Sequence, residues 1–385
     1  MKHGIMQEKN KMAPSLYIHI PFCVKKCGYC DFYSINYDAG LASAYVDALV
    51  GQMGGIGCRV STIFIGGGTP TALSAPLLKK LLRGAARSAA RNAEFTVEAN
   101  PESLDAGKLS LLLDEGVNRL SIGVQSFNDA KLKKLGRIHN AKKAADAVML
   151  SNKKGFDDLN IDLIFGAPEE EFDDYSAELA RAVKLPVTHI SCYGLTYEKG
   201  TPLYKARKRG GVIPVDEERS ARMYSFAIDY LPEHGFRHYE VSNFAEKGFE
   251  CRHNLNYWRN DEYIGLGPSA VSYIGGARKR HLPDVVEYVK RVRSGKSTIV
   301  SSERLAEDRK AKETAAVKIR TSEGIDLDWF KKKTGFDLEE LEADALQKLS
   351  GAGLIKYERI KGKAAGISLT KKGFLFCDTV SSELL

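Results

Sequence analysis

Three cysteines lie close together near the N-terminus, in the segment CVKKCGYC that begins at Cys23. This C-x3-C-x2-C spacing lets one loop present the thiolates of Cys23, Cys27 and Cys30 to three corners of a [4Fe–4S] cluster, and the fourth iron then has no protein ligand. An iron of this kind can coordinate a small molecule. Structural zinc, with His19 or Cys58 as the fourth ligand, is the competing interpretation. Because His19 would lie in the strand before the loop and the sequence has no second C-x2-C pair, the cluster is favoured.

The elements that must position this loop alternate between strands and helices from residue 15 to about residue 245. Strands that are apolar throughout and joined by helix-length connections pair in parallel, with helices covering the sheet. The sequence therefore predicts an α/β fold, a partial (β/α)6 barrel. The predicted strands are 15–20, 61–67, 95–99, 119–124, 159–165, 188–194 and 238–242, and the predicted helices are 73–91, 103–114, 139–153, 171–184 and 216–232.

Polar residues or glycines stand where each of the first five predicted strands ends. The cysteine loop follows the first strand, and Gly-Gly-Gly-Thr-Pro at 66–70 follows the second. Glu98 ends the third strand, Gln125 follows the fourth, and Asp162 lies in the fifth. The carboxyl ends of parallel barrel strands converge on one mouth, where active sites are built. A turn or cap role would explain any one of these residues alone, but five in phase predict a common site.

The pattern changes after about residue 300, where three helical patterns precede a small hairpin and a final helix at 371–384. This order resembles a winged helix, a module that binds nucleic acid in some proteins and is a structural lid in others. No aromatic or Arg/Asn constellation specifies base readout, so nucleic acid is not an expected partner. The predicted division is a flexible N-terminal extension at 1–14, the barrel at 15–245, a connecting segment at 246–300 and a winged-helix-like domain at 301–385.

The composition, with 43% hydrophobic and 28% charged residues, excludes a fibrous or wholly disordered chain. No apolar run approaches the ~18 residues of a membrane span, and the first fourteen residues lack a secretion signal. The odd cysteine count argues against a disulfide framework, so we expect a cytoplasmic protein.

The formal net charge is +8, and residues 278–320 hold thirteen Lys and Arg against six Asp and Glu. A solvated helical surface is the favoured interpretation, and phosphates, propionates or peripheral contact with an anionic membrane are the alternatives.

The cysteine spacing after a first strand, followed by Gly-Gly-Gly-Thr-Pro after the second, resembles the radical S-adenosylmethionine superfamily. In that superfamily the open iron chelates S-adenosylmethionine, and one electron from the cluster cleaves the sulfonium. Further segments resemble the coproporphyrinogen dehydrogenase-like family, and the resemblance covers nearly the whole chain. These segments are YIHIPF from Tyr17, VEANP from Val97, GVQSF from Gly123, LGR from Leu135 and NIDL from Asn160.

Two departures from the dehydrogenase resemble the HemW branch of this family. The dehydrogenase ends its cluster motif with Cys-Gly-Cys, where this sequence has Cys30-Asp31-Phe32, and HNLNYW from His253 matches the H-N-x-x-Y-W motif of the HemW branch. Members of that branch bind haem and are regarded as chaperones that insert it into haemoproteins. The resemblance implies a haem chaperone with haem and client haemoproteins as partners, and it suggests dimerisation. An oxygen-independent coproporphyrinogen III dehydrogenase is the alternative.

The resemblance also implies roles for single residues. Tyr17 would lie beside the cluster-bound S-adenosylmethionine, and Glu98 would accept hydrogen bonds from its polar groups. The methionine end would be lined by Gly67, Gly68 and Thr69.

Three further positions, Gln125, Arg137 and Asp162, match those that hold a second S-adenosylmethionine in the dehydrogenase. Arg137 could instead pair with a carboxylate, or form a surface salt bridge. His253 is the haem-ligand candidate, since imidazole is a good axial ligand of haem iron. The alternative is a capping loop in which His253 is hydrogen-bonded locally and Cys251 is an inert buried thiol.

Overall fold

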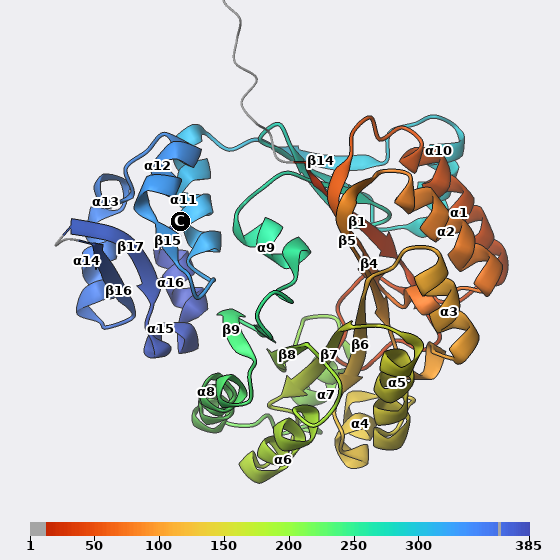
Figure 1. The fold of residues 1–385 in the computed structure, drawn as a ribbon, viewed down its shortest axis with the longest axis horizontal. Coiled ribbons are helices and arrows are strands. Elements are labelled where there is room, and N and C mark those ends of the chain that lie inside the picture. The colour runs from red at the N-terminus through yellow and green to blue at the C-terminus, as the bar shows by residue number, and fades with distance from the viewer. Residues whose placement is uncertain (1–12, 361–362) are drawn as a thin grey trace, which may run out of the picture.

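The computed structural model describes residues 13–360 and 363–385, and in these one mixed sheet dominates the first three hundred residues. Six neighbouring strands of this sheet are parallel and form the curved wall in Figure 1, which confirms the predicted partial barrel. The predicted extension at 1–14 lies outside the described residues except for its last two. The parallel strands are β1 (Ser15–Ile20), β4 (Val60–Gly67), β5 (Ala89–Ala99), β6 (Arg119–Gln125), β7 (Asp158–Phe165) and β8 (His189–Gly194).

Helices cover the outer face of the curved sheet in Figure 1. Their buried leucines and alanines pack on the apolar side chains of one face of the strands, such as Leu120, Ile122 and Val124 of β6. The alternate residues of β6 are also buried and include the polar Arg119, Ser121 and Gln125, so the other face of the sheet is largely polar. Among the described residues, no helix is both long and apolar enough to cross a membrane. The helices of this part are α1 (Ala39–Met53), α2 (Ala75–Ala86), α3 (Ala106–Asp114), α4 (Asp129–Leu135), α5 (Ala141–Lys154), α6 (Phe172–Ala182), α7 (Pro202–Lys208) and α8 (Glu217–Glu233), with 3-10 turns η1 (Pro70–Ala72) and η2 (Pro101–Ser103).

Both edges of the sheet contain antiparallel strands, unlike its parallel centre. The run predicted at 238–242 is an antiparallel edge strand, β9 (Arg237–Glu240), which pairs with β10 (Asn243–Ala245). At the other edge, the segment predicted as a connection supplies a strand parallel to β1 and an antiparallel extension. The elements of this edge are α9 (Arg252–Trp258), β11 (Tyr263–Leu266), β12 (Val271–Ile274), β13 (Ala277–His281), α10 (Val285–Arg293) and β14 (Ile299–Glu303).

The C-terminal part has its own core, built around Phe330, Leu346 and Ile367, and its described residues form six helices and a three-stranded sheet in a winged-helix-like arrangement. The helix predicted at 371–384 is in fact two helices, because the backbone leaves the helical conformation at Phe376. The elements are α11 (Glu307–Lys318), β15 (Ile325–Asp326), α12 (Leu327–Thr334), α13 (Leu338–Leu341), α14 (Ala343–Gly351), β16 (Ile355–Ile360), β17 (Lys363–Leu369), α15 (Lys371–Leu375) and α16 (Cys377–Glu383).

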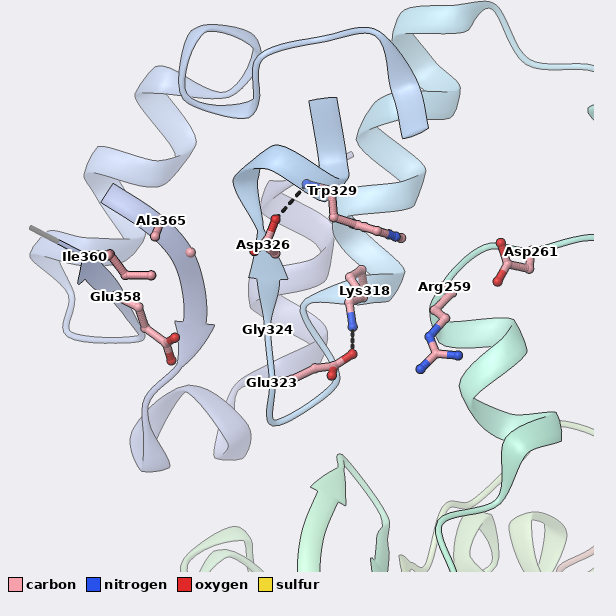
Figure 2. A pocket seen from close by; sticks show the side chains of 11 residues that line it. Arg259, Asp261, Lys318, Glu323, Gly324, Asp326, Trp329, Glu358, Ile360 and Ala365 are labelled. Carbon is pink, nitrogen blue, oxygen red and sulfur yellow. Dashed lines mark hydrogen bonds and ion pairs between the residues drawn. The ribbon is translucent and has the colours of Figure 1, made fainter. Parts of the chain in front are cut away.

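Backbone hydrogen bonds join this C-terminal part to the edge strand β9. Val241 N–H donates to the Arg320 carbonyl at 3.0 Å, and Ser322 N–H donates to the Tyr239 carbonyl at 3.0 Å. A cavity of about 620 Å³ lies at the junction. In Figure 2, Arg259 lies just beyond α9 on one side of it, and residues of the C-terminal part lie on the other. The C-terminal part is therefore fixed against the barrel rather than tethered by a free linker.

A buried ion triad joins helix α4 to α6 and the loop before it. Lys131 Nζ lies 2.7 Å from Glu178 Oε2 and also contacts the Glu170 carboxylate, and all three residues are buried. Glu170 Oε2 in turn accepts a hydrogen bond from Ala167 N–H at 2.9 Å. The ammonium group is thus the shared partner of two carboxylates that are out of water.

Replacing Lys131 with methionine leaves these two carboxylates buried without their cation. We expect Lys131→Met to lower the free energy of unfolding by about 3–5 kcal/mol, measured by urea denaturation. The control is Lys142→Met, since Lys142 pairs with Asp146 on the exposed surface of α5 and its loss should change stability by less than about 1 kcal/mol. Equal effects of the two substitutions would contradict this account.

Candidate functional site

The three motif cysteines lie on a loop at the mouth of the barrel, directly after β1. Cys23 ends the two-residue strand β2 (Phe22–Cys23), which pairs with β3 (Ile35–Asn36), and Cys27 and Cys30 follow on the loop. All three thiols are free and partly exposed. Two hydrogen bonds of Gly28 hold the loop against the barrel, one from its N–H to the Leu135 carbonyl at 3.2 Å and one from Leu203 N–H to its carbonyl at 2.8 Å.

A ring of hydrogen bonds links two of these sulfurs through Thr69 after β4, Asn100 after β5 and Arg137 after helix α4. Thr69 Oγ1 donates to Cys23 Sγ at 3.7 Å, and Asn100 Nδ2 donates to Thr69 Oγ1 at 2.8 Å. Arg137 closes the ring by donating to Asn100 Oδ1 at 2.6 Å and to Cys27 Sγ at 3.4 Å. The guanidinium therefore brings a positive charge to the thiols. The role of Asn100 was not predicted from the sequence, although this residue directly follows the third strand.

Two of the three thiols are held in the protonated form in the absence of metal. Burial raises the pKa of Cys23, and burial raises the pKa of Cys30 to about 11. Both side chains are thus thiols at neutral pH until iron displaces their protons. Three sulfurs on one loop, a cationic neighbour and partial exposure fit a cluster with one open iron.

The zinc alternative has no fourth ligand in this arrangement. Cys58 is exposed and precedes β4, so it lies at the opposite ends of the parallel strands. His19 uses both ring nitrogens, with Nδ1 2.9 Å from the Tyr17 hydroxyl and Nε2 2.7 Å from the Tyr33 carbonyl oxygen. In the part of the chain that the structure describes, His, Cys, Asp and Glu side chains form no group of three that could hold a single metal ion.

The glycine segment packs against the start of the cysteine loop with no room for side chains. A Cβ at Gly67 would lie 2.4 Å from the His19 ring, and one at Gly68 would lie 2.7 Å from the carbonyl oxygens of Ile20 and Phe22. Gly67 also has a φ of 104°, which favours glycine. The close approach is thus made by the His19 ring at Gly67 and by the backbone of the cysteine loop at Gly68, and a contact of these glycines with S-adenosylmethionine stays a prediction.

Two half-buried carboxyl groups lie inside the barrel near this segment. Glu98 Oε2 accepts a hydrogen bond from Gly67 N–H at 3.0 Å, and Asp162 Oδ1 accepts one from Asn160 Nδ2 at 2.8 Å. Burial, and then the charge of Asp162, raise the pKa of Glu98 to about 7, and burial raises the pKa of Asp162. A cationic ligand would favour their ionised forms, so the pair suits a site for a positively charged molecule.

Other predicted residues complete the same mouth. Gln125 is buried at the end of β6 with a φ of 64°, an uncommon conformation for a residue with a side chain. Arg137 also donates to the Gly123 carbonyl oxygen at 2.8 Å, so the hydrogen bonds described for this half-buried residue go to a sulfur, an amide oxygen and a carbonyl oxygen. The cysteine loop after β1 and the predicted residues of β4, β5, β6 and β7 therefore gather at one mouth of the barrel.

His253 lies apart from the cluster loop, buried on α9 against β4. Its Nδ1 is 2.7 Å from the Thr62 hydroxyl, its Nε2 is 3.0 Å from the Tyr257 hydroxyl, and its ring stacks on Phe64. Burial, and then the charge of Arg119, lower the pKa of His253 to about 3, so the imidazole is neutral. Both ring nitrogens are hydrogen-bonded within the protein in this conformation.

Comparisons with known proteins identify the family and the fold of the chain. Residues 17–182 match the radical SAM superfamily, and residues 305–376 match the HemN C-terminal domain. The fold is that of coproporphyrinogen III oxidase (HemN) from Escherichia coli, with a TM-score of 0.83 at 22% identity over 97% of this chain and 90% of that one. The fold and the cysteine loop thus define a radical S-adenosylmethionine protein.

Curated relatives show to which family of radical S-adenosylmethionine proteins the chain belongs. The chain is 34% identical to the heme chaperone HemW of Lactococcus lactis over 96% of its own length and 97% of that protein. It is 34% identical to the heme chaperone HemW of Bacillus subtilis, over 96% of this chain and 99% of that protein. It is 41% identical to the heme chaperone HemW of Escherichia coli, over 68% of this chain and 70% of that protein. The chain belongs to the HemW family.

Cluster assembly should depend on the loop cysteines and not on the exposed one. Cys30→Ser removes one of three thiol ligands, so we expect anaerobically reconstituted protein to lose most of its bound iron and sulfide, measured by chemical analysis. Cys58→Ser is the matched control and should retain the wild-type content, because Cys58 lies at the other end of the barrel. Loss of iron and sulfide in Cys58→Ser would contradict this account and would support Cys58 as a fourth metal ligand.

Proposed function

We propose that this protein is a haem chaperone that carries a [4Fe–4S] cluster and S-adenosylmethionine and delivers haem to client haemoproteins. The observation that carries this proposal is the match along nearly the whole chain to relatives named for haem chaperoning. The cluster loop and the barrel mouth support it, because they combine three thiols with a cationic neighbour and half-buried carboxyls.

Cys23, Cys27 and Cys30 would hold three irons of the cluster. When bound, the cluster supplies an open iron that chelates the amino and carboxylate groups of S-adenosylmethionine, and one electron for its cleavage. Arg137 would stabilise the negative charge of the thiolates through its contact with Cys27. The residues proposed to surround S-adenosylmethionine are Tyr17, Gly67, Gly68, Thr69 and Glu98.

A second S-adenosylmethionine site stays a prediction, and Gln125 and Asp162 are the residues that would contact the molecule there. Arg137, the third predicted contact, already donates to Cys27, Asn100 and Gly123, so we assign it to the surroundings of the cluster. Haem ligation by His253 likewise stays a prediction, and it would require the hydrogen bonds to Thr62 and Tyr257 to break.

Coproporphyrinogen III dehydrogenase is the second candidate function, since the fold matches HemN. Phe32, which is 62% exposed, stands where the dehydrogenase motif has a cysteine, and this difference favours the chaperone. A homodimer and a peripheral membrane contact stay predictions from the sequence.

One paired assay separates these functions. Protein reconstituted anaerobically with iron and sulfide should take up about one haem per chain, seen as a Soret band that persists through gel filtration. With S-adenosylmethionine and a reductant it should not convert coproporphyrinogen III, followed by chromatography of the oxidised porphyrins. Turnover without haem uptake would establish the dehydrogenase instead.

A further inference from the structure

The loop that bears the three cysteines has an inner side toward the barrel and an outer side toward solvent. On the inner side, Cys23 Sγ accepts a hydrogen bond from Thr69, and Cys27 Sγ accepts one from Arg137. Residues 24–26, which lie between these two cysteines, are exposed. The outer side is therefore the part of the loop that another molecule can reach without entering the barrel.

Two helices with exposed cations flank this outer side. Gly28 of the loop is hydrogen-bonded to Leu135, the last residue of α4, and to Leu203, the second residue of α7. Because α7 has only seven residues, it spans roughly 10 Å, and its whole length stays close to the loop. The exposed cations of this surface, which we call the basic face, are Lys25, Lys26, Lys133, Lys134, Lys205, Arg207, Lys208 and Arg209.

The charge of the basic face is largely uncompensated. Among the described residues, Lys134 is the one cation of this face that forms a salt bridge, with Glu169 at 2.8 Å. Arg207 and Lys208 instead lie near aromatic rings, which leave their positive charge in place. Asp31 of the loop is exposed and offsets one of these charges. A surface of this kind attracts an acidic partner.

Apolar side chains are exposed on the same surface. Val24 and Phe32, on either side of the cluster ligands, are 57% and 62% exposed. Ile138, which follows Arg137, is 47% exposed. A protein–protein interface combines apolar contacts at its centre with charged residues at its rim. The basic face has both parts, and the cysteine loop lies between them.

We propose that the basic face docks a small acidic protein that carries a reduced flavin or iron–sulfur group and passes one electron to the cluster. This inference rests on the proposed function and names the partner of that same cluster. In the step, the carrier gives up one electron to the cluster, which is thereby reduced by one electron. No bond breaks and no proton moves.

The size of the basic face and its place in the fold favour such a partner. Electron-transfer complexes bury small interfaces, so complementary charge rather than contact area brings the two proteins together. Nucleic acids and anionic membranes also bind cations, but neither supplies the electron that each cleavage of S-adenosylmethionine consumes. An electron carrier docked here would lie against the loop that bears Cys23, Cys27 and Cys30.

Stopped-flow reduction of the reconstituted protein by a reduced flavodoxin, a small acidic flavoprotein, tests the docking. The double variant Lys205→Glu/Lys208→Glu reverses two exposed charges in the last turn of α7. At low salt, we expect the second-order rate constant of cluster reduction to fall about tenfold, and the Kd for oxidised flavodoxin to rise by a similar factor. The difference from wild type should vanish in about 1 M salt, where the Debye length is about 3 Å.

The matched control is Lys153→Glu/Lys184→Glu, which also reverses two exposed lysines at the ends of helices. These lysines precede β7 and β8, at the opposite end of the parallel strands from the cysteine loop, so the rate constant and the Kd should stay at the wild-type values. Dithionite, a small inorganic reductant that needs no docking, should reduce the cluster of wild type and both variants to the same extent.

Three outcomes would overturn the inference. Equal effects of the two double variants, or a wild-type rate constant that does not change with salt, would remove the docking surface and leave the proposed function standing. Loss of binding to phosphatidylglycerol vesicles in Lys205→Glu/Lys208→Glu, with an unchanged rate of reduction by flavodoxin, would assign the basic face to a membrane. Absence of a cluster that dithionite can reduce in the wild type would remove the proposed function, and the docking surface with it.

Discussion

The backbone contact between the ends of β1 and β4 is the constraint on which the site depends. Gly68 N–H donates to the Ile20 carbonyl oxygen at 2.8 Å and Thr69 N–H to the Phe22 carbonyl oxygen at 2.7 Å, so the pairing of the two strands continues into the cysteine loop. Since no Cβ fits at Gly67 or Gly68, the contact requires glycine. It brings the hydroxyl of Thr69 to a cluster thiol, and it sets where the loop begins.

From this contact the remaining site follows strand by strand. The parallel register carries Glu98, Asn100 and Asp162 to the same mouth, and the ring through Thr69 and Arg137 returns to the cysteine loop. Residues of the antiparallel extension and of α9, among them Tyr263, Arg280 and Tyr257, line a cavity of about 600 Å³ beside the cysteine loop, to which Lys26 also contributes.

The sequence predicted the six parallel strands and the grouping of the site residues, because apolar strands and polar strand ends are local patterns. It missed β11 to β14, since β11 is a short strand whose partner β1 is more than two hundred residues away. It also assigned His253 from a motif, without its burial against Thr62 and Phe64. Such contacts depend on where α9 packs, which no local pattern specifies.

Electron paramagnetic resonance of the reduced, anaerobically reconstituted protein tests the open-iron cluster most directly. The account predicts a [4Fe–4S]⁺ signal whose line shape changes when S-adenosylmethionine is added, because the molecule coordinates the iron that Cys23, Cys27 and Cys30 leave free. A cluster signal that stays the same at saturating S-adenosylmethionine would contradict it.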